Sequence, residues 1–329
     1  MKVFAVWIRR SPVVAFYVIC YVISWGLWLP LILSRNDLAE LIAVIGLFGP
    51  ALACIIVSRK SSSPAKGSRA IPFWLSFISG WIVSTLAFLI YSGAASTSPV
   101  VWVIFAVLAL VPAYIIASVV SSLSGFRSKR SQARPNGWWG WYVAAVALPL
   151  VLRLVSVWLS RQIGWGFLSD PRPPSSLMDL AGSVLMVFLY TLIYAGGLNE
   201  ETGWTGLALP RLQAKFSPLV STIVLWALWM LWHVPMYLSG YFDLSAHVLI
   251  GSFFGRFLMT WLFIRSSGGV LTGILLHTSV NVTSQFVPLT NASMLVDAVV
   301  ALLVIVGGRM WRRLPEENSA VLAEERLAA

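Results

Sequence analysis

Long apolar runs separated by short polar segments make up most of this chain, and the pattern predicts membrane-spanning helices. About 20 apolar residues form a helix long enough to cross about 30 Å of hydrocarbon. Such runs predict ten helices, with eight to ten spans as the expected range, and hence an all-α fold class: a polytopic transmembrane helical bundle. The runs occupy residues 12–34, 41–58, 74–92, 100–122, 141–159, 182–208, 218–238, 244–264, 269–289 and 293–308.

Composition leads to the same class. The chain is 58% apolar, 13% aromatic and 11% charged, whereas soluble proteins are about half apolar and about a quarter charged. A soluble domain has no means of burying so much apolar surface. The net charge of +11 does not predict nucleic-acid binding, because the basic residues form short clusters between apolar runs instead of one continuous face.

The basic clusters occur at every second connection between the predicted helices. Because positively charged loops remain on the inner side of a membrane, this alternation predicts that both termini and these loops lie in the cytoplasm. The expected location is the plasma (inner) membrane. The clusters are Lys2/Arg9/Arg10, Arg59/Lys60/Lys66/Arg69, Arg127/Lys129/Arg130/Arg134, Arg211/Lys215, Arg265 and Arg309/Arg312/Arg313.

Two neighbouring acidic residues interrupt the sixth apolar run. Glu200 and Glu201 are two of only eight acidic residues outside the polar tail at 314–329. Ionisable groups in hydrocarbon are costly and are therefore candidates for function. If one helix continues to Arg211, Glu200 lies about 15 Å below the membrane surface. The alternative is a helix that ends at residue 198 and leaves both carboxylates in a wet loop.

Two of the three histidines lie in later predicted spans, each with a polar or aromatic neighbour on the same helix face. His233 follows Trp229 by four residues, and His277 precedes Asn281 by four, a spacing that puts both members of a pair on one side of a helix. The predicted depths are about 20 Å for His233 and about 12 Å for His277, which bracket that of Glu200.

These residue types suit the hydrolysis of an amide bond. A carboxylate in a low-dielectric site is a base for water, and an imidazole can orient that water. A second imidazole and an amide can stabilise the oxyanion that forms on the peptide carbonyl. The alternative is a zinc ion held by Glu200, His233 and His277. Asn is a poor zinc ligand and the chain lacks a His-Glu-x-x-His signature, so metal-free hydrolysis with no required cofactor is favoured.

The three motifs resemble those of the CAAX-protease and bacteriocin-processing intramembrane endopeptidases, which include the type II CAAX prenyl endopeptidases. That family has Glu-Glu-x-x-x-Arg, then an aromatic-x-x-x-His, then His-x-x-x-Asn. The resemblance covers about residues 180–285. It implies an intramembrane protease in which Glu200 activates water, His233 orients it, and His277 with Asn281 stabilises the oxyanion. The implied partners are a lipid bilayer and a prenylated or membrane-associated peptide substrate.

Two positions depart from the family pattern. Thr205 stands where the family has Arg, so Glu201, expected as a supporting group, needs another partner such as Arg256 or Arg153. Trp229 stands where Phe is commoner. Because adjacent helical residues point about 100° apart, Glu200 and Glu201 are expected not to face one centre.

The chain is expected to comprise N-terminal transmembrane helices at 1–175, a catalytic core at 176–290, a last transmembrane helix at 291–313 and a cytoplasmic tail at 314–329. Two other functions stay open. Thr205 favours a weakly active or inactive scaffold or immunity protein of the same family, and buried Glu and His residues also occur in proton-coupled transporters.

Overall fold

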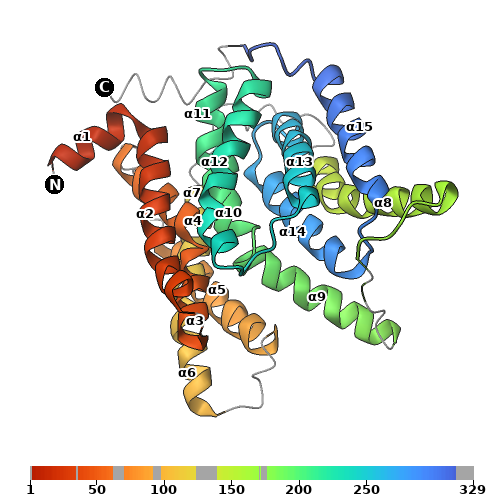
Figure 1. Cartoon of the computed structure of the whole chain (residues 1–329). Helices are drawn as coiled ribbons and strands as arrows, with labels where there is room; N and C mark the ends of the chain where they lie inside the picture. The colour runs from red at the N-terminus through yellow and green to blue at the C-terminus, as the bar shows by residue number, and fades with distance from the viewer. Residues whose placement is uncertain are drawn as a thin grey trace.

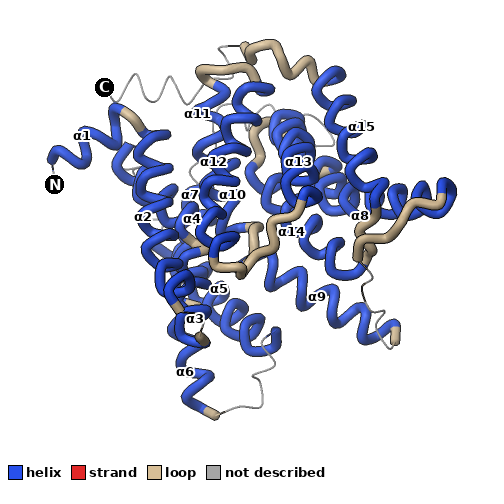
Figure 2. The backbone as a smooth tube through the Cα atoms, in the orientation of Figure 1, coloured by secondary structure: helices blue, strands red, loops and turns tan. Residues whose placement is uncertain are grey.

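A computed structural model of the chain describes residues 2–34, 36–61, 70–91, 98–123, 139–169, 171 and 176–315. Within these residues the secondary structure is helical throughout, and Phe167 and Thr290 form an isolated β-bridge outside any strand. The helices pack side by side as a bundle (Figure 1) and are joined mostly by short connections (Figure 2). The predicted all-α, polytopic class is confirmed.

The N-terminal half contributes eight helices among the described residues. Pro12 begins the first long one, where its missing N–H is not needed for a helical hydrogen bond. The helices are α1 (Lys2–Arg10), α2 (Pro12–Leu33), α3 (Asp37–Gly46), α4 (Gly49–Ser61), α5 (Ala70–Tyr91), α6 (Pro99–Leu108), α7 (Leu110–Leu123) and α8 (Gly140–Ile163).

The C-terminal half contains the segments that carry the three motifs. They include one π-helical stretch, η3, in which the Leu209 N–H donates to the carbonyl of Trp204. The elements are α9 (Leu177–Tyr194), α10 (Leu198–Gly203), η3 (Trp204–Ala208), α11 (Leu209–Gln213), α12 (Pro218–Leu238), α13 (Ala246–Arg265), α14 (Val270–Phe286) and α15 (Asn291–Gly307).

Each of the ten predicted apolar runs falls on helical structure, but three of them are broken. The breaks lie at residues 47–48, at Ala109 and at residues 195–197. Six described helical segments are long and apolar enough to cross a membrane, and three shorter apolar helices accompany them. The count of ten spans therefore stays a prediction.

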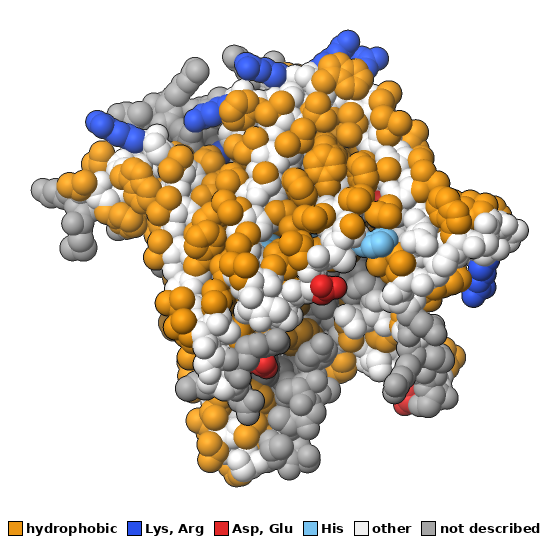
Figure 3. Space-filling view, in the orientation of Figure 1, with side chains coloured by type: hydrophobic (Ala, Val, Ile, Leu, Met, Phe, Trp, Pro, Cys, Tyr) orange, Lys and Arg blue, Asp and Glu red, His pale blue; other side chains and the backbone are white. Residues whose placement is uncertain are grey.

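Basic residues from distant parts of the sequence lie at one end of the bundle. Arg9 and Arg10 of α1 line the same surface pocket as Arg211 and Lys215 of the α11 end. In Figure 3 most of the Lys and Arg side chains visible on this face lie along its upper edge, above a largely apolar surface. This agrees with the predicted grouping of the basic connections. The clusters within 62–69 and 124–138, and the tail from residue 316, lie outside the described residues.

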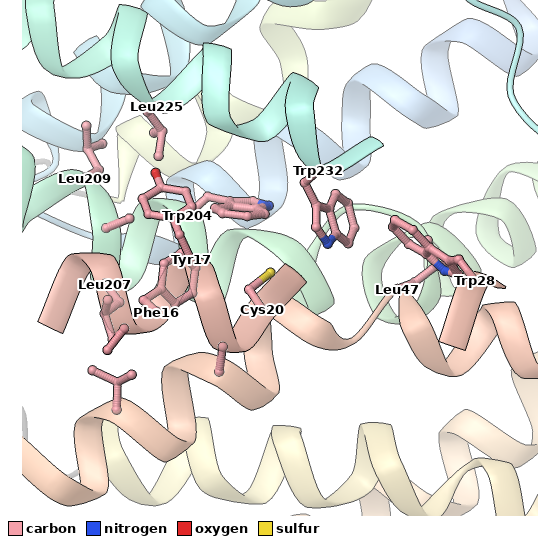
Figure 4. Close-up of a cluster of buried hydrophobic side chains, with 14 of the residues drawn as sticks. Phe16, Tyr17, Cys20, Trp28, Leu47, Trp204, Leu207, Leu209, Leu225 and Trp232 are labelled. Carbon is pink, nitrogen blue, oxygen red and sulfur yellow. The ribbon is translucent and has the colours of Figure 1, made fainter. Parts of the chain in front are cut away.

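A tryptophan-rich core joins the N-terminal helices to the motif-bearing segments (Figure 4). The fully buried ring of Trp204 in η3 meets Phe16 of α2 edge-on at 5.1 Å and Trp232 of α12 at 5.7 Å. Trp232 in turn contacts Trp28 of α2 at 4.8 Å between ring centroids. These contacts fix the segment that follows the two glutamates between α2 and α12.

Replacing Trp204 with Ala is expected to destabilise the protein by about 3–5 kcal/mol, because the cavity would lie in a closely packed aromatic cluster. Thermal unfolding of the purified protein in detergent measures this effect. Trp158, whose side chain is 61% exposed, is the matched control, and Trp158→Ala should leave the unfolding temperature nearly unchanged. Equal shifts for the two variants would contradict the assigned role of Trp204.

Candidate active site

The two glutamates lie at the start of a new helix, directly after a break in the chain. Gly196, with φ +104°, turns the backbone between α9 and α10, and glycine adopts this conformation without steric penalty. Asn199 stabilises the turn: its side-chain oxygen accepts the Gly196 N–H at 2.9 Å, and its amide donates to the Leu47 carbonyl at 3.0 Å.

This break corrects the expectation of one continuous helix over 182–208. The alternative of a wet loop is also wrong, because Glu200 and Glu201 are 5% and 0% exposed. Both carboxylates lie in the first turn of α10, where unpaired backbone N–H groups favour negative charge.

Glu201 is the most completely compensated charge of the site. The Arg256 Nη1 of α13 lies 3.0 and 3.1 Å from its two carboxylate oxygens. His277 Nδ1 of α14 lies 2.8 Å from Oε1, and the Thr205 hydroxyl donates to Oε2. A carboxylate sealed from water needs such partners, since burying an unpaired charge is strongly unfavourable. Glu201 therefore joins α10, α13 and α14.

Glu200 has a more open environment. The Trp229 indole N–H of α12 donates to its Oε2 at 2.6 Å. Glu200 keeps 5% of its surface exposed, His233 6% and His277 13%. Glu200 and the two imidazoles are thus slightly exposed, whereas Glu201 is fully buried.

The two carboxylates share one centre. Ligand atoms of Glu200, Glu201 and His277 all lie within 4.8 Å of one another. The expectation that adjacent helical residues cannot face one centre is wrong here. The two side chains leave the helix in different directions, but each has two flexible methylene groups, which allow both carboxylates to approach the same imidazole.

The hydrogen bond at His233 fixes which ring nitrogen carries the proton. Nδ1 lies 2.9 Å from the carbonyl oxygen of Trp229. A carbonyl only accepts, so Nδ1 is the donor, and in the neutral ring Nε2 keeps a lone pair. The His233 ring lies 4.3 Å from the Trp229 ring. His233 therefore presents a hydrogen-bond acceptor next to the residue that binds Glu200.

His277 and Asn281 both border the break between α9 and α10. The Asn281 amide donates to the carbonyl of Ala195 at 2.7 Å. His277 Nε2 lies so close to Gly196 that a Cβ there would be 2.5 Å away. Since one Asn281 N–H is used by the backbone, only its second N–H can serve a bound substrate.

Arg256 was one of the two cations considered as a partner of Glu201. It contacts Glu201 and also Trp229, the residue that donates to Glu200. It pairs with Glu201, and its guanidinium lies 5.1 Å from the centre of the Trp229 ring, which donates to Glu200. Arg153 lies on α8, and the structure shows no ion pair between it and Glu201 in the described part of the chain. Seven of the eight predicted site residues thus belong to one contiguous set of contacts, and Asn281 joins the site through the Ala195 carbonyl next to Gly196.

Two residues that shape the site were not predicted from the sequence. Gly196 and Asn199 build the turn that places the glutamates. The available signal was a Gly-Gly pair followed by Asn within an otherwise apolar run, which indicates a chain break.

The arrangement fits zinc poorly. The compact ligand set includes Glu201, whose oxygens already accept hydrogen bonds from Arg256, Thr205 and His277. A second cation would have to share this carboxylate with a guanidinium 3.0 Å away. Zinc on the alternative set of Glu200, His233 and His277 stays an untested prediction.

Comparison with known proteins points to one family. A family model described as type II CAAX prenyl endopeptidase Rce1-like matches residues 181–283. A CAAX prenyl protease 2 from Methanococcus maripaludis is 24% identical over 172 residues, which cover 49% of this chain and 62% of that protein. The chain thus spans less than two thirds of the relative's length. Both findings confirm the resemblance to the CAAX protease family, and the matched segment contains all eight site residues.

Changing Gly196 to Ala is expected to destabilise the protein by about 1–3 kcal/mol, because Ala is strained at positive φ and its Cβ would displace the His277 ring. Thermal unfolding provides the measurement. A Cβ added to Gly182 of α9 would have nothing within 4 Å, so Gly182→Ala is the control, and it should be neutral or slightly stabilising. A Gly196→Ala protein as stable as the control would contradict the close approach.

Proposed function

Starting from the similarity of residues 181–283 to the type II CAAX prenyl endopeptidases, we propose that this protein is an intramembrane endopeptidase. It hydrolyses a peptide bond near the cytoplasmic face of the membrane. The observation that carries the proposal is the convergence of Glu200, Glu201 and His277 within 4.8 Å in a largely buried site.

Glu200 is the proposed base. Its Oε2 is held by the Trp229 N–H, which leaves Oε1 to take a proton from water while the water oxygen attacks the peptide carbonyl carbon. The His233 Nε2 lone pair accepts the second water hydrogen and orients the molecule. Collapse of the tetrahedral intermediate breaks the C–N bond, and the proton on Glu200 passes to the leaving amine.

His277 and Asn281 are the proposed oxyanion donors. His277 Nδ1 is engaged by Glu201, so Nε2 donates to the oxyanion when the ring carries both protons. The second Asn281 N–H completes the pair, the first being bound to Ala195.

The proposed substrate is a prenylated or otherwise membrane-associated peptide or protein. The matched relative is named as a CAAX prenyl protease, and the site lies on the helical segment whose far end carries Arg211 and Lys215. We place this basic end and both termini in the cytoplasm, with the protein in the plasma membrane. Residues 176–290 form the proposed catalytic core.

Replacing Glu200 with Gln is expected to lower turnover of a prenylated or membrane-embedded peptide by about 10²–10⁴-fold, because the amide cannot accept the water proton. His277→Ala should cause a comparable loss. Purified variants are compared by product formation in detergent or liposomes, and Glu40→Gln, at an exposed position of α3, is the control.

Equal turnover of the wild-type, Glu200→Gln and His277→Ala proteins would refute the catalytic assignment. A biological phenotype that survives loss of both Glu200 and His233 would instead indicate a non-enzymatic scaffold. Ligand-dependent proton uptake by protein-containing liposomes would indicate a transporter.

Hydrolysis is expected to persist after metal removal. In the proposed mechanism Glu200 activates the water, and His277 with Asn281 stabilises the oxyanion, so no Lewis acid takes part. Incubation with a strong zinc chelator, followed by buffer exchange, should leave turnover within about twofold of the untreated enzyme. Loss of activity that added Zn²⁺ restores would overturn the metal-free mechanism.

A further inference from the structure

The cation that neutralises Glu201 comes from a different helix than the motif pattern leads one to expect. The pattern has Arg four residues after the second Glu, and this chain has Thr205 there. The charge is supplied instead by Arg256 of α13, which is 4% exposed and pairs with a fully buried carboxylate. A buried carboxylate keeps its charge only with such a partner.

Thr205 is closely packed as well as hydrogen-bonded. It is fully buried, and its hydroxyl donates to Glu201. A Cβ at Gly273 of α14 would lie only 3.0 Å from the Thr205 methyl group, so the backbone of α14 approaches η3 at this point. An arginine at 205 would have to push α14 away.

This close approach also positions His277. Gly273 and His277 are four residues apart and therefore lie on one face of α14. With Gly273 against Thr205, the His277 ring reaches Glu201 at 2.8 Å. The contact between α14 and η3 thus requires a small side chain at position 205 and also brings His277 within hydrogen-bond distance of Glu201.

Arg256 is also connected to Glu200, through Trp229. Its guanidinium lies 5.1 Å from the Trp229 ring centre, a distance at which a cation is attracted to an indole face. The same indole donates to Glu200 at 2.6 Å. A phenylalanine at 229 would have no N–H for this bond.

We propose that Arg256 is a positioning residue that, with Thr205, replaces the arginine of the motif. It acts through Glu201 on His277 and through Trp229 on Glu200. This inference rests on the proposed function. In this proposal the positive charge that the motif carries at position 205 is supplied by Arg256 of α13 instead. Thr205 therefore does not abolish activity.

The experiment is a double-mutant cycle on Arg256→Gln and Glu201→Gln, read as kcat, KM and thermal unfolding temperature. Arg256→Gln is expected to lower kcat by about tenfold or more while KM stays within about twofold, since no substrate contact is lost. The combined loss of kcat in the double variant should be clearly smaller than the product of the two single losses, because one of the two routes by which Arg256 acts is already lost with Glu201. Arg256→Lys should recover part of kcat.

Arg265→Gln is the matched control. Arg265 lies on the same helix and also stacks on an indole, 5.6 Å from the Trp141 ring centre, but it is exposed and far along the helix from Glu201. Its kcat and unfolding temperature should match the wild type. Additive losses in the Arg256/Glu201 cycle, or wild-type kcat in Arg256→Gln, would overturn the proposal.

A third experiment tests whether the close approach of α14 to η3 requires a small residue at position 205. Thr205→Arg in the Arg256→Gln background returns the charge to the motif position, and kcat is expected not to recover because α14 is displaced. Full recovery would overturn the claim that a small residue is required. If the wild type and Glu200→Gln are equally inactive on every peptide, the proposed function fails, while the unfolding temperatures of the cycle still test the Arg256–Glu201 coupling.

Discussion

A single ionised carboxylate, removed from water inside the bundle, sets the conditions that the surrounding helices satisfy. Glu201 is fully buried and is bound by groups from three segments, Arg256 of α13, His277 of α14 and Thr205 of η3. Removing one partner of a buried ion pair leaves an uncompensated charge, which is far more costly than losing an exposed pair. The relative positions of α10, α13 and α14 are therefore coupled, and the imidazole of His277 is oriented by the same contacts.

Trp229 transmits this order to the more open half of the site. One residue contributes an indole N–H to Glu200, a carbonyl to His233 and a ring face to Arg256. An aromatic side chain with a polar edge suits a position that is apolar on its faces and needs one directed donor. The four-residue spacing from Trp229 to His233 makes the carbonyl contact available, because a helical side chain at i can reach the backbone carbonyl at i−4.

The helices and the cluster of chemistry-bearing residues followed from the sequence, because apolar runs of spanning length and rare ionisable residues within them are local signals. The break at Gly196 did not follow. Its geometry depends on Asn199 reaching Leu47, a contact between segments far apart in the chain. The convergence of Glu200 and Glu201 was also not predicted. Helix geometry gives the directions of the Cβ atoms, but it does not give the positions of the carboxylates at the ends of flexible side chains. Arg256 was one of two candidate partners, and only the packing of α13 against the site distinguished it from Arg153.

The π-helical stretch η3 has a consequence for how this segment tolerates change in length. A π turn holds one more residue than an α turn, so it rotates whatever follows by about 100° relative to a regular helix. Before it, α10 presents Glu200 and Glu201 to the site; after it, Leu209 and Leu212 of α11 face the tryptophan-rich core. Deleting one residue between Trp204 and Ala208 would restore an ordinary helix. Either the glutamates would then face the site or the leucines would face the core, but not both. We therefore expect this segment to tolerate substitutions better than the loss or gain of a residue, since a change in length would separate the orientation of the acidic pair from that of the apolar anchor.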